Sequence, residues 1–316
     1  MVRLVHFSML VVLSVIWGSA FMLVKVALED VPPLTLVAGR VTTAFLFLGA
    51  ILVISGRTLP RSRDAWFAFT FLAIVNNAFP FTLLTWGQQH IESALAAILV
   101  ATMPLSTVVL AHVWINERLT LDRALGVLVG FGGVFLLIGG DLQDITGSST
   151  LGQLAIIGGV VGYSTGTVFA RRYMVNADPD VTAAGQTLVG SVIMIPIALT
   201  VETPFDLSVS VKAGLAWVAL GVVASAIAYQ IFFRLVRDIS ATQASMVSYL
   251  IPITAVLLGV LVLDESLEAS RIAGLAVIIF GVWVVNGGGG WLIALLSRGD
   301  TALAAEPLSE PDAGLH

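Results

Sequence analysis

Long apolar runs alternate with short polar breaks along the whole chain. Ten runs approach the length of about 20 mostly apolar residues that crosses the hydrocarbon core of a membrane. They cover residues 5–27, 34–54, 65–87, 94–114, 124–140, 152–170, 182–200, 214–235, 240–262 and 272–293. The breaks are short and carry turn and charge residues, as at 29–33, 55–64 and 176–180. The pattern predicts an all-α polytopic membrane protein with ten transmembrane helices and no inserted soluble domain.

Composition agrees with this fold class. Hydrophobic residues make up 58% of the 316 residues and charged residues 11%, whereas a soluble domain carries about 25% charged residues. Cysteine is absent, which excludes a disulfide framework and thiolate metal sites. The net charge of −5 owes much to four acids after Arg298. We therefore expect no nucleic-acid partner, no metal and no cofactor.

The chain contains an internal repeat. Residues 91–138 align without a gap on residues 239–286, an offset of 148. Matches of Val and Leu carry little weight in so apolar a chain, but Pro, Glu, Arg and Gly in register do. The matched pairs are Pro104 and Pro252, Glu117 and Glu265, Arg123 and Arg271, Gly126 and Gly274, and Gly133 and Gly281.

The repeat extends to both halves of the chain. Residues 71–91 align with 219–239 at the same offset, and Gly39-Arg40 aligns with Gly185-Gln186. Each half then has five helices, and because five is odd, the second half enters the membrane from the opposite side. The sequence predicts two inverted repeats, an arrangement typical of transporters. We divide the chain into a first repeat (1–140), a linker (141–151), a second repeat (152–293) and a disordered tail (294–316).

Basic residues indicate the orientation. With the N-terminus in the cytoplasm, the inner segments hold 11 of the 15 Lys and Arg residues, which is the usual positive-inside bias. These are Arg3, Arg57, Arg61, Arg63, Arg118, Arg123, Arg171, Arg172, Arg234, Arg237 and Arg298. We expect a multi-pass protein of the inner cell membrane with both termini cytoplasmic. Residues 1–20 also imitate a signal peptide, but the apolar run continues past them and has a counterpart at 161–173.

Several short motifs resemble EamA-type members of the drug/metabolite transporter superfamily. They are Trp17-Gly18-Ser19, Arg40, the stretch 93–105 with its following Glu117, and the stretch 241–267. The second Glu motif, Asp264-Glu265-Ser266, departs from the usual Gly-Glu-Arg of the family. The resemblance covers roughly residues 5–290. It implies a ten-helix carrier whose central cavity is lined by the first four helices of each half, and many relatives export amino acids or other small metabolites.

Arg40 is the only clear charge inside an apolar run, about six residues or ~9 Å from its outer end. Charges at such depth are costly and usually face a partner or a wet cavity. Arg40 is therefore a candidate anchor for a substrate carboxylate, since a guanidinium offers two parallel hydrogen bonds. The alternatives are snorkelling to the surface or pairing with Glu29 or Asp30. No Asp or Glu lies mid-run, which favours zwitterionic, anionic or neutral cargo over cations.

Other polar and aromatic residues interrupt the apolar runs and are candidates for substrate binding. They are Trp17, Asn76, Asn77, Tyr163, Tyr229, Gln230, Ser248 and Tyr249. Hydrogen bonding between helices is the alternative role for each of them. His112 is a candidate for proton coupling, with packing near the helix end as its alternative, and a coupling ion is also open.

The Pro, Glu and Gly residues matched by the repeat are predicted to shape the helices and their contacts. Pro104 and Pro252 each remove a backbone donor within an apolar run and predict a kink, either mobile in gating or static. Glu117 and Glu265 are interpreted as structural turn residues that serve the start of the following helix. The Gly-rich runs near 126–133 and 274–281 give smooth helix faces. These faces predict close contact, either inside the chain or in a homodimer.

The function predicted from these features is transport of a small metabolite such as an amino acid, by alternating access between the two repeats. Export rather than import follows from the resemblance alone. One alternative is a membrane-embedded enzyme, which would need a catalytic cluster that the sequence lacks. Another is a non-transporting scaffold, for which we would expect few interior polar groups and longer loops.

Overall fold

The structure, a computed structural model, describes residues 4–138, 147–239, 241–245, 247–266 and 268–285. Those residues form helices and connecting turns, without strands. Seven spans are long and apolar enough to cross a membrane, and three shorter apolar helices bring the number to the predicted ten. The predicted tail 294–316 and linker residues 141–146 lie outside the described residues.

The ten spans follow the predicted runs closely, although four of them comprise more than one helical segment. The helices are α1 (Leu4–Ala27), α2 (Pro33–Ile54), α3 (Arg63–Leu72) with η1 (Ala73–Ala78) and α4 (Phe79–Gly87), α5 (Ser93–Val100) with α6 (Met103–Ile115), α7 (Leu121–Ile138), α8 (Ser148–Tyr173), α9 (Pro179–Val201), α10 (Val211–Gly221) with η4 (Val222–Ile227) and α11 (Ala228–Asp238), α12 (Ala241–Ser245) with α13 (Val247–Leu263), and α14 (Ala269–Trp283). A short 3₁₀ helix, η3 (Pro204–Asp206), precedes α10.

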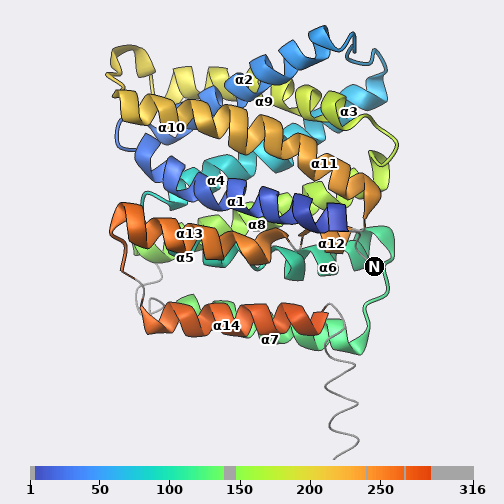
Figure 1. Cartoon of the computed structure of the whole chain (residues 1–316), viewed down its shortest axis with the longest axis vertical. Helices are drawn as coiled ribbons and strands as arrows, with labels where there is room; N and C mark the ends of the chain where they lie inside the picture. Colours follow the sequence, from blue (N-terminus) through green and yellow to red (C-terminus); the bar gives the residue numbers. More distant parts are fainter. Residues whose placement is uncertain (1–3, 139–146, 240, 246, 267, 286–316) are drawn as a thin grey trace, which may run out of the picture.

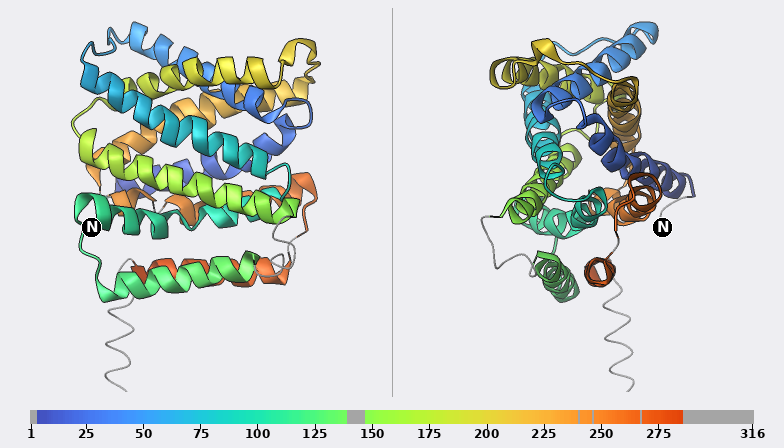
Figure 2. Two further views of the ribbon diagram at one scale, coloured as in Figure 1. Left: turned by 180° about the vertical axis from the view of Figure 1, so that it is seen from behind. Right: turned by 90° about the vertical axis from the view of Figure 1, so that its left-hand side faces the viewer.

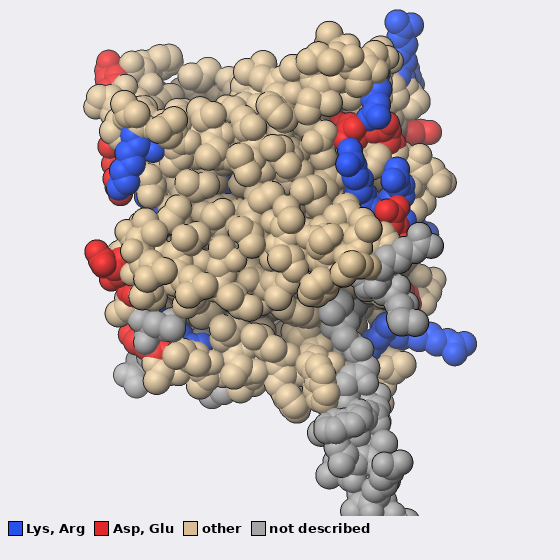
Figure 3. All heavy atoms as spheres, in the orientation of Figure 1, with Lys and Arg blue, Asp and Glu red and all other residues tan. Residues whose placement is uncertain are grey.

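The helices run side by side, so that their ends gather at two opposite faces (Figures 1 and 2). Charged side chains follow the same two faces, and a broad uncharged surface lies between them (Figure 3). Large apolar side chains are exposed on that surface, such as Leu46 at 63% and Leu261 at 75%. Exposed Leu in such numbers is unfavourable in water and favourable in lipid. The chain is a membrane-embedded multi-pass protein.

Helix contacts recur with the two halves exchanged. α1 packs on α13 as α6 packs on α8, and α1 packs on α10 as α4 packs on α8. Two further pairs, α2 with α9 and α7 with α14, each join equivalent helices of the two halves.

The α2–α9 pair is antiparallel, with each helix start bonded by the other helix's end. Glu202 after α9 accepts from the backbone N–H groups of Leu34 (2.9 Å) and Thr35 (2.7 Å). At the opposite face, Arg57 after α2 pairs with Asp180 in the first turn of α9. Both contacts place an acid at a helix N-terminus, where the helix dipole stabilises negative charge.

The repeated Glu motif ends α6 and α13 in the same way. Each helix is followed by a residue in the left-handed region, Asn116 (φ 55°) and Asp264 (φ 54°). The next residue in each case is the Glu that the repeat matches, Glu117 or Glu265. Glu265 accepts from the backbone N–H groups of Ser93 (2.7 Å) and Ala94 (3.0 Å). Our expectation that Glu265 serves the following helix is therefore wrong, since it caps α5 in the other half. Glu117 lies 3.6 Å from Arg123.

Two π-helical segments interrupt the third and eighth spans. η1 and η4 lie at nearly equivalent places in the repeat, and each includes the pair of positions related by the offset of 148, Asn76-Asn77 and Ala224-Ser225. A π turn widens the helix and leaves carbonyl groups for other donors, and such turns are frequent at functional sites. The apolar pattern of the sequence did not predict them.

The Gly-rich faces of α7 and α14 pack on each other inside the chain. A Cβ added at Gly126 would lie 2.5 Å from the Gly281 carbonyl oxygen, and one added at Gly133 would lie 2.9 Å from Ile278 Cγ1. Without side chains at these positions, the two helices approach closely enough for backbone contact. The two alternatives for these faces were contact inside the chain and contact in a homodimer. The structure shows the contact inside the chain.

We expect Gly126→Ala to lower stability by about 1–3 kcal/mol, because the new methyl group overpacks the α7–α14 contact. Gly132→Ala is the matched control on the same helix. No atom lies within 4 Å of a Cβ there, and Ala favours the helix over Gly by about 1 kcal/mol. Thermal unfolding of the purified protein in detergent measures both. Equal melting temperatures for the two variants would contradict the packing described.

Candidate binding cavity

A cavity of about 80 Å³ lies between the helices of the two halves. Its walls come from α1, α2, α4 and η1, α5, α6, α8, α11 and α13. These are the first to fourth helices of the first half and the first, third and fourth of the second, whereas α7, α9 and α14 contribute no lining residue. The walls are mostly apolar, and the polar or amphipathic side chains among them are Trp17, Arg40, Asn76, Thr85, Gln88, Tyr163, Thr167 and Tyr229. The volume suits several water molecules or a small solute.

The cavity reaches one face of the molecule more nearly than the other. Val24 and Gln88 line it within a turn of the ends of α1 and α4. Toward the opposite face, the α11 lining stops at Phe232, six residues or about 9 Å before Asp238 ends the helix.

Aromatic rings and an arginine close that opposite face. Phe71 and Phe169 stack with ring centroids 4.3 Å apart, and Trp114 meets both of them. Arg171 at the end of α8 donates to the carbonyls of Val236 and Arg237 at the end of α11, 3.0 Å each. The cavity therefore lies nearer to the face where α1 and α4 end.

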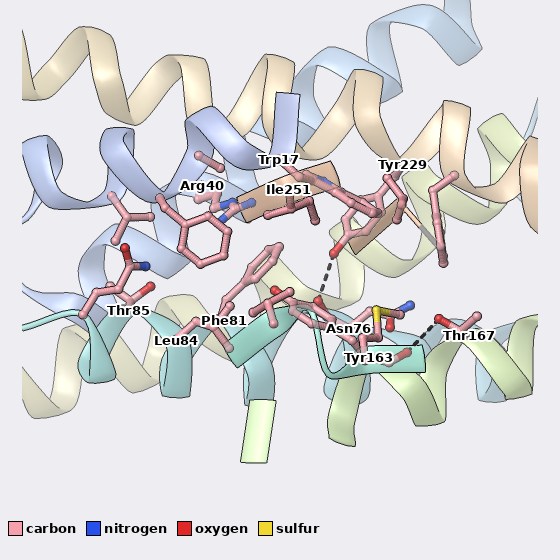
Figure 4. A pocket seen from close by; sticks show the side chains of 18 residues that line it. Trp17, Arg40, Asn76, Phe81, Leu84, Thr85, Tyr163, Thr167, Tyr229 and Ile251 are labelled. Carbon is pink, nitrogen blue, oxygen red and sulfur yellow. Dashed lines mark hydrogen bonds between the residues drawn. The ribbon is translucent and has the colours of Figure 1, made fainter. Parts of the chain in front are cut away.

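Arg40 is buried in the wall of the cavity, with 6% of its surface exposed (Figure 4). Its Nε donates to the Ser225 hydroxyl in η4 at 2.8 Å. Its guanidinium carbon lies 3.8 Å from the centroid of the Phe81 ring, a cation–π contact worth up to about 2 kcal/mol when desolvated. Both contacts fix the orientation of the guanidinium without neutralising its charge.

No acid pairs with Arg40 among the residues that the structure describes. Glu29, one suggested partner, lies 3.0 Å from Lys212 Nζ. Asp30, the other, accepts from Ser210 N at 2.9 Å, and the hydrogen bonds of Ser210 hold the pKa of Asp30 below its ordinary value. Arg40 is also too deeply buried to snorkel. Both alternatives for Arg40 are therefore wrong, and an unpaired cation faces the cavity.

Hydrogen bonds to the two π helices build the polar part of the wall. The Tyr229 hydroxyl lies 2.7 Å from Asn77 Oδ1 and 2.9 Å from the Asn76 carbonyl of η1. Trp17 Nε1 donates to the Ala224 carbonyl of η4 at 3.1 Å. Positions 76 and 224 are repeat equivalents, so each half offers the same π-helix carbonyl to an aromatic donor.

Gln186 occupies in the second half the position that Arg40 occupies in the first. Arg40 contacts Ser225 in η4, and Gln186 contacts the equivalent Asn77 in η1, whose Nδ2 donates to the Gln186 carbonyl at 3.2 Å. Gln186 also accepts from Asn76 Nδ2 at 3.4 Å. The repeat thus matches a cation in the cavity wall of the first half with a neutral amide in the second half that does not line the cavity.

The structure separates the predicted site residues into two groups. Trp17, Arg40, Asn76, Tyr163 and Tyr229 line the cavity. The others, Asn77, Gln230, Ser248 and Tyr249, do not.

Protein contacts account for part of the second group. Asn77 is fully buried behind Tyr229, and Gln230 Nε2 donates to Asp180 Oδ1 at 2.9 Å. Ser248 and Tyr249 lie in α13, one turn before Pro252. The role of the nine predicted residues in substrate binding stays a prediction.

The predicted kinks take different forms. α5 ends at Val100 and α6 begins at Met103, so Pro104 follows a break between two helices. Pro252 lies inside α13, and the residue between α12 and α13 is outside the described part. Met103 and Ile251, next to the two prolines, both line the cavity. Movement of the kinks stays a prediction.

His112 does not line the cavity. It lies near the exposed end of α6, where its Nδ1 is 2.8 Å from the Glu117 carbonyl. Sequence reasoning missed four lining residues of the third span, Phe81, Leu84, Thr85 and Gln88. It also missed Ser225 behind Arg40. The spacing of Thr85 and Gln88, three residues apart on one helix face, was the available signal.

Comparison with known proteins identifies related transporters. A sequence model of the EamA-like transporter family matches residues 6–139 and, a second time, residues 150–287. The uncharacterized inner membrane transporter YedA of Escherichia coli strain K12 is 29% identical over 286 residues, which cover 89% of this chain and 90% of the relative. The uncharacterized transporter YoaV of Bacillus subtilis strain 168 is 24% identical over 271 residues, covering 86% and 93%.

A third relative has a more specific name. It is a probable terminal-alkyne amino-acid exporter of Streptantibioticus cattleyicolor, 28% identical over 279 residues, which cover 88% of this chain and 92% of the relative. A solved chain described only as a protein crystal structure superimposes with a TM-score of 0.68 at 20% identity. The match covers 90% of this chain and 97% of the solved one, and it supports the fold alone.

Removing the Tyr229 hydroxyl tests the hydrogen-bonded wall. We expect Tyr229→Phe to lower stability by about 1–3 kcal/mol, because it leaves buried acceptors on Asn76 and Asn77 without their donor. Tyr163→Phe is the matched control, since the Tyr163 hydroxyl has no hydrogen bond within the described residues. Thermal unfolding in detergent should separate the two variants, and equal losses would contradict this wall.

Proposed function

Since the chain belongs to the EamA-like transporter family, we propose that it exports a small carboxylate-bearing metabolite, such as an amino acid, across the cell membrane. The observation that carries the proposal is Arg40, a buried cation in the cavity wall with no acid partner among the described residues. A buried unpaired charge is strongly unfavourable. A substrate carboxylate would supply the missing anion each time the site is filled.

The transport mechanism that we propose is alternating access between two inverted five-helix repeats. Support comes from the helix contacts, which recur with the halves exchanged, and from the two separate matches to the family. Rocking of one repeat against the other would give access to the cavity alternately from the face near Phe71 and Phe169 and from the opposite face. The Arg40 site would stay near the centre of both conformations.

Amino acids are favoured as cargo by two independent arguments. A planar guanidinium binds a carboxylate with two parallel hydrogen bonds, and Phe81 and Ser225 already hold the Arg40 side chain in place. One relative carries the name of a probable amino-acid exporter. Enzymatic catalysis is the weaker reading, because no group of metal-ligating residues occurs in the described part and the relatives are transporters.

The orientation that we propose has both termini in the cytoplasm, so the face nearer to the cavity is the outer one. The basis is the positive-inside distribution of Arg and Lys. A reporter fused after Arg63 should then report the cytoplasm, and one fused after Asp206 the outside. Reports from the same compartment would contradict the ten-span arrangement.

Substitution of Arg40 tests the function. We expect Arg40→Lys to lower the initial transport rate of carboxylate cargo about tenfold or more, because an ammonium group lacks the bidentate fork. Arg40→Gln should lose more, while cargo without a carboxylate is little affected by either change. Uptake into proteoliposomes of equal protein content measures the rates, with amino acids and organic acids as cargo.

The matched control is Arg61→Lys, the same change at an exposed position. It should leave every rate unchanged. Equal rates for wild type, Arg40→Lys and Arg40→Gln would remove Arg40 from the site. The absence of transport for every cargo by the wild type would contradict the proposed function itself.

A further inference from the structure

Two polar side chains of the third span line the cavity without protein partners. Thr85 is 1% exposed and Gln88 is 2% exposed. Neither side chain forms a hydrogen bond with any described residue, and Gln88 Oε1 is fully enclosed. Buried polar groups in proteins are nearly always hydrogen-bonded. Two such groups on one cavity wall therefore indicate a site for a polar ligand.

The position of these residues at the end of α4 indicates which ligand charge the site favours. Thr85 and Gln88 are three residues apart, so their side chains lie on the same face of the helix. α4 ends at Gly87, and Gln88 is its cap residue. The C-terminal end of a helix carries a partial negative charge that favours cations. Hydroxyl, amide and helix end together suit an ammonium group.

Most other polar groups of the wall are bonded within the protein, and the Tyr163 hydroxyl, which has no hydrogen bond among the described residues, belongs to a half-buried side chain rather than a buried one. Trp17 and Tyr229 are bonded to the π-helix carbonyls, and the Thr167 hydroxyl donates to the Tyr163 carbonyl at 2.8 Å. Arg40 contributes the opposite charge to the same cavity. Figure 4 shows Arg40 and Thr85 toward one end of the cavity and Tyr229 and Thr167 toward the other.

We propose that Thr85 and Gln88 form a second subsite, which binds the ammonium group of a zwitterionic solute whose carboxylate lies on Arg40. This inference rests on the proposed function and names the residues that bind the amine. Rotation of the Gln88 amide about its Cγ–Cδ bond presents Oε1 as the acceptor, and the Thr85 hydroxyl adds a second acceptor.

Apolar side chains around the two subsites favour a ligand whose remaining part is apolar. Phe21, Val24, Leu84 and Ile251 line the cavity and offer no hydrogen bonds. A second charged group would be buried there without a partner, which is unfavourable. The favoured ligand therefore has one carboxylate, one amine and an apolar body.

Matched pairs of compounds test the subsite. The pairs are L-leucine with isocaproate, L-phenylalanine with hydrocinnamate, and L-alanine with propionate, in which the second member lacks only the amine. Binding to the full chain in lipid nanodiscs is measured by titration calorimetry. The wild type should bind the amino acid of a pair roughly tenfold tighter than its partner acid, as expected for a hydrogen bond to a charged group.

Gln88→Leu should abolish most of this preference by weakening amino-acid binding roughly tenfold, with the amine-free acid unaffected. Thr85→Val should act in the same direction to a smaller extent. Gln88→Glu keeps the shape and adds negative charge, so it should increase the preference for the amino acid. Gln89→Leu is the matched control at the next, exposed position, and it should leave all affinities as in the wild type.

The possible results separate the subsite from the function on which it rests. An equal loss for both members of a pair in Gln88→Leu would overturn the subsite and assign Gln88 to water or packing. Equal wild-type affinities within each pair would overturn it as well, while leaving transport intact. Binding of none of the six compounds by a folded wild type would overturn the carboxylate anchor and the subsite together. If Gln88→Leu fails to fold, Gln88→Glu and Thr85→Val decide, and an unchanged preference in both overturns the subsite.

Discussion

A guanidinium held between helices, with no carboxylate beside it among the described residues, is the constraint on which the rest of this site depends. In a low-dielectric interior the charge must be compensated, and Phe81 and Ser225 orient Arg40 without removing its charge. The nearest acids suggested by the sequence are engaged elsewhere, Glu29 with Lys212 and Asp30 with Ser210. The cavity is therefore electrostatically incomplete in the protein alone. Under the proposed function, a substrate anion would complete it each time the site is filled.

Duplication followed by divergence explains how one cavity acquired this asymmetry. Each half sends a residue of its second helix to the π helix of the other half, Arg40 to Ser225 and Gln186 to Asn77. In one half the residue is charged and faces the cavity, and in the other it is neutral and hydrogen-bonded to the protein. The packing stays reciprocal, since the Gly-lined contact of α7 and α14 and the α2–α9 pair both join equivalent helices. The helix packing of the two halves has stayed symmetric, whereas the matched residues Arg40 and Gln186 differ in charge.

Much of the fold could be predicted from the sequence because lipid imposes a strong pattern on it. Apolar runs of spanning length predict the ten helices, and the single mid-run charge points to Arg40, which does line the cavity. The π helices could not be predicted, since an extra residue in a turn leaves the apolar run unbroken. Nor could the capping of α5 by Glu265, because it depends on which helices of the two halves become neighbours. Thr85 and Gln88 look like ordinary polar residues near a helix end until the fold turns them toward Arg40's cavity.

Labelling of a single cysteine tests most directly whether one cavity serves both faces of the membrane. The chain contains no cysteine, so Met103→Cys places one reporter in the cavity wall. A membrane-impermeant maleimide is added to right-side-out vesicles and, separately, to everted ones. Alternating access predicts labelling from either side, with protection in both when a transported solute is present. Labelling from one side only, in vesicles that transport the solute, would contradict this account.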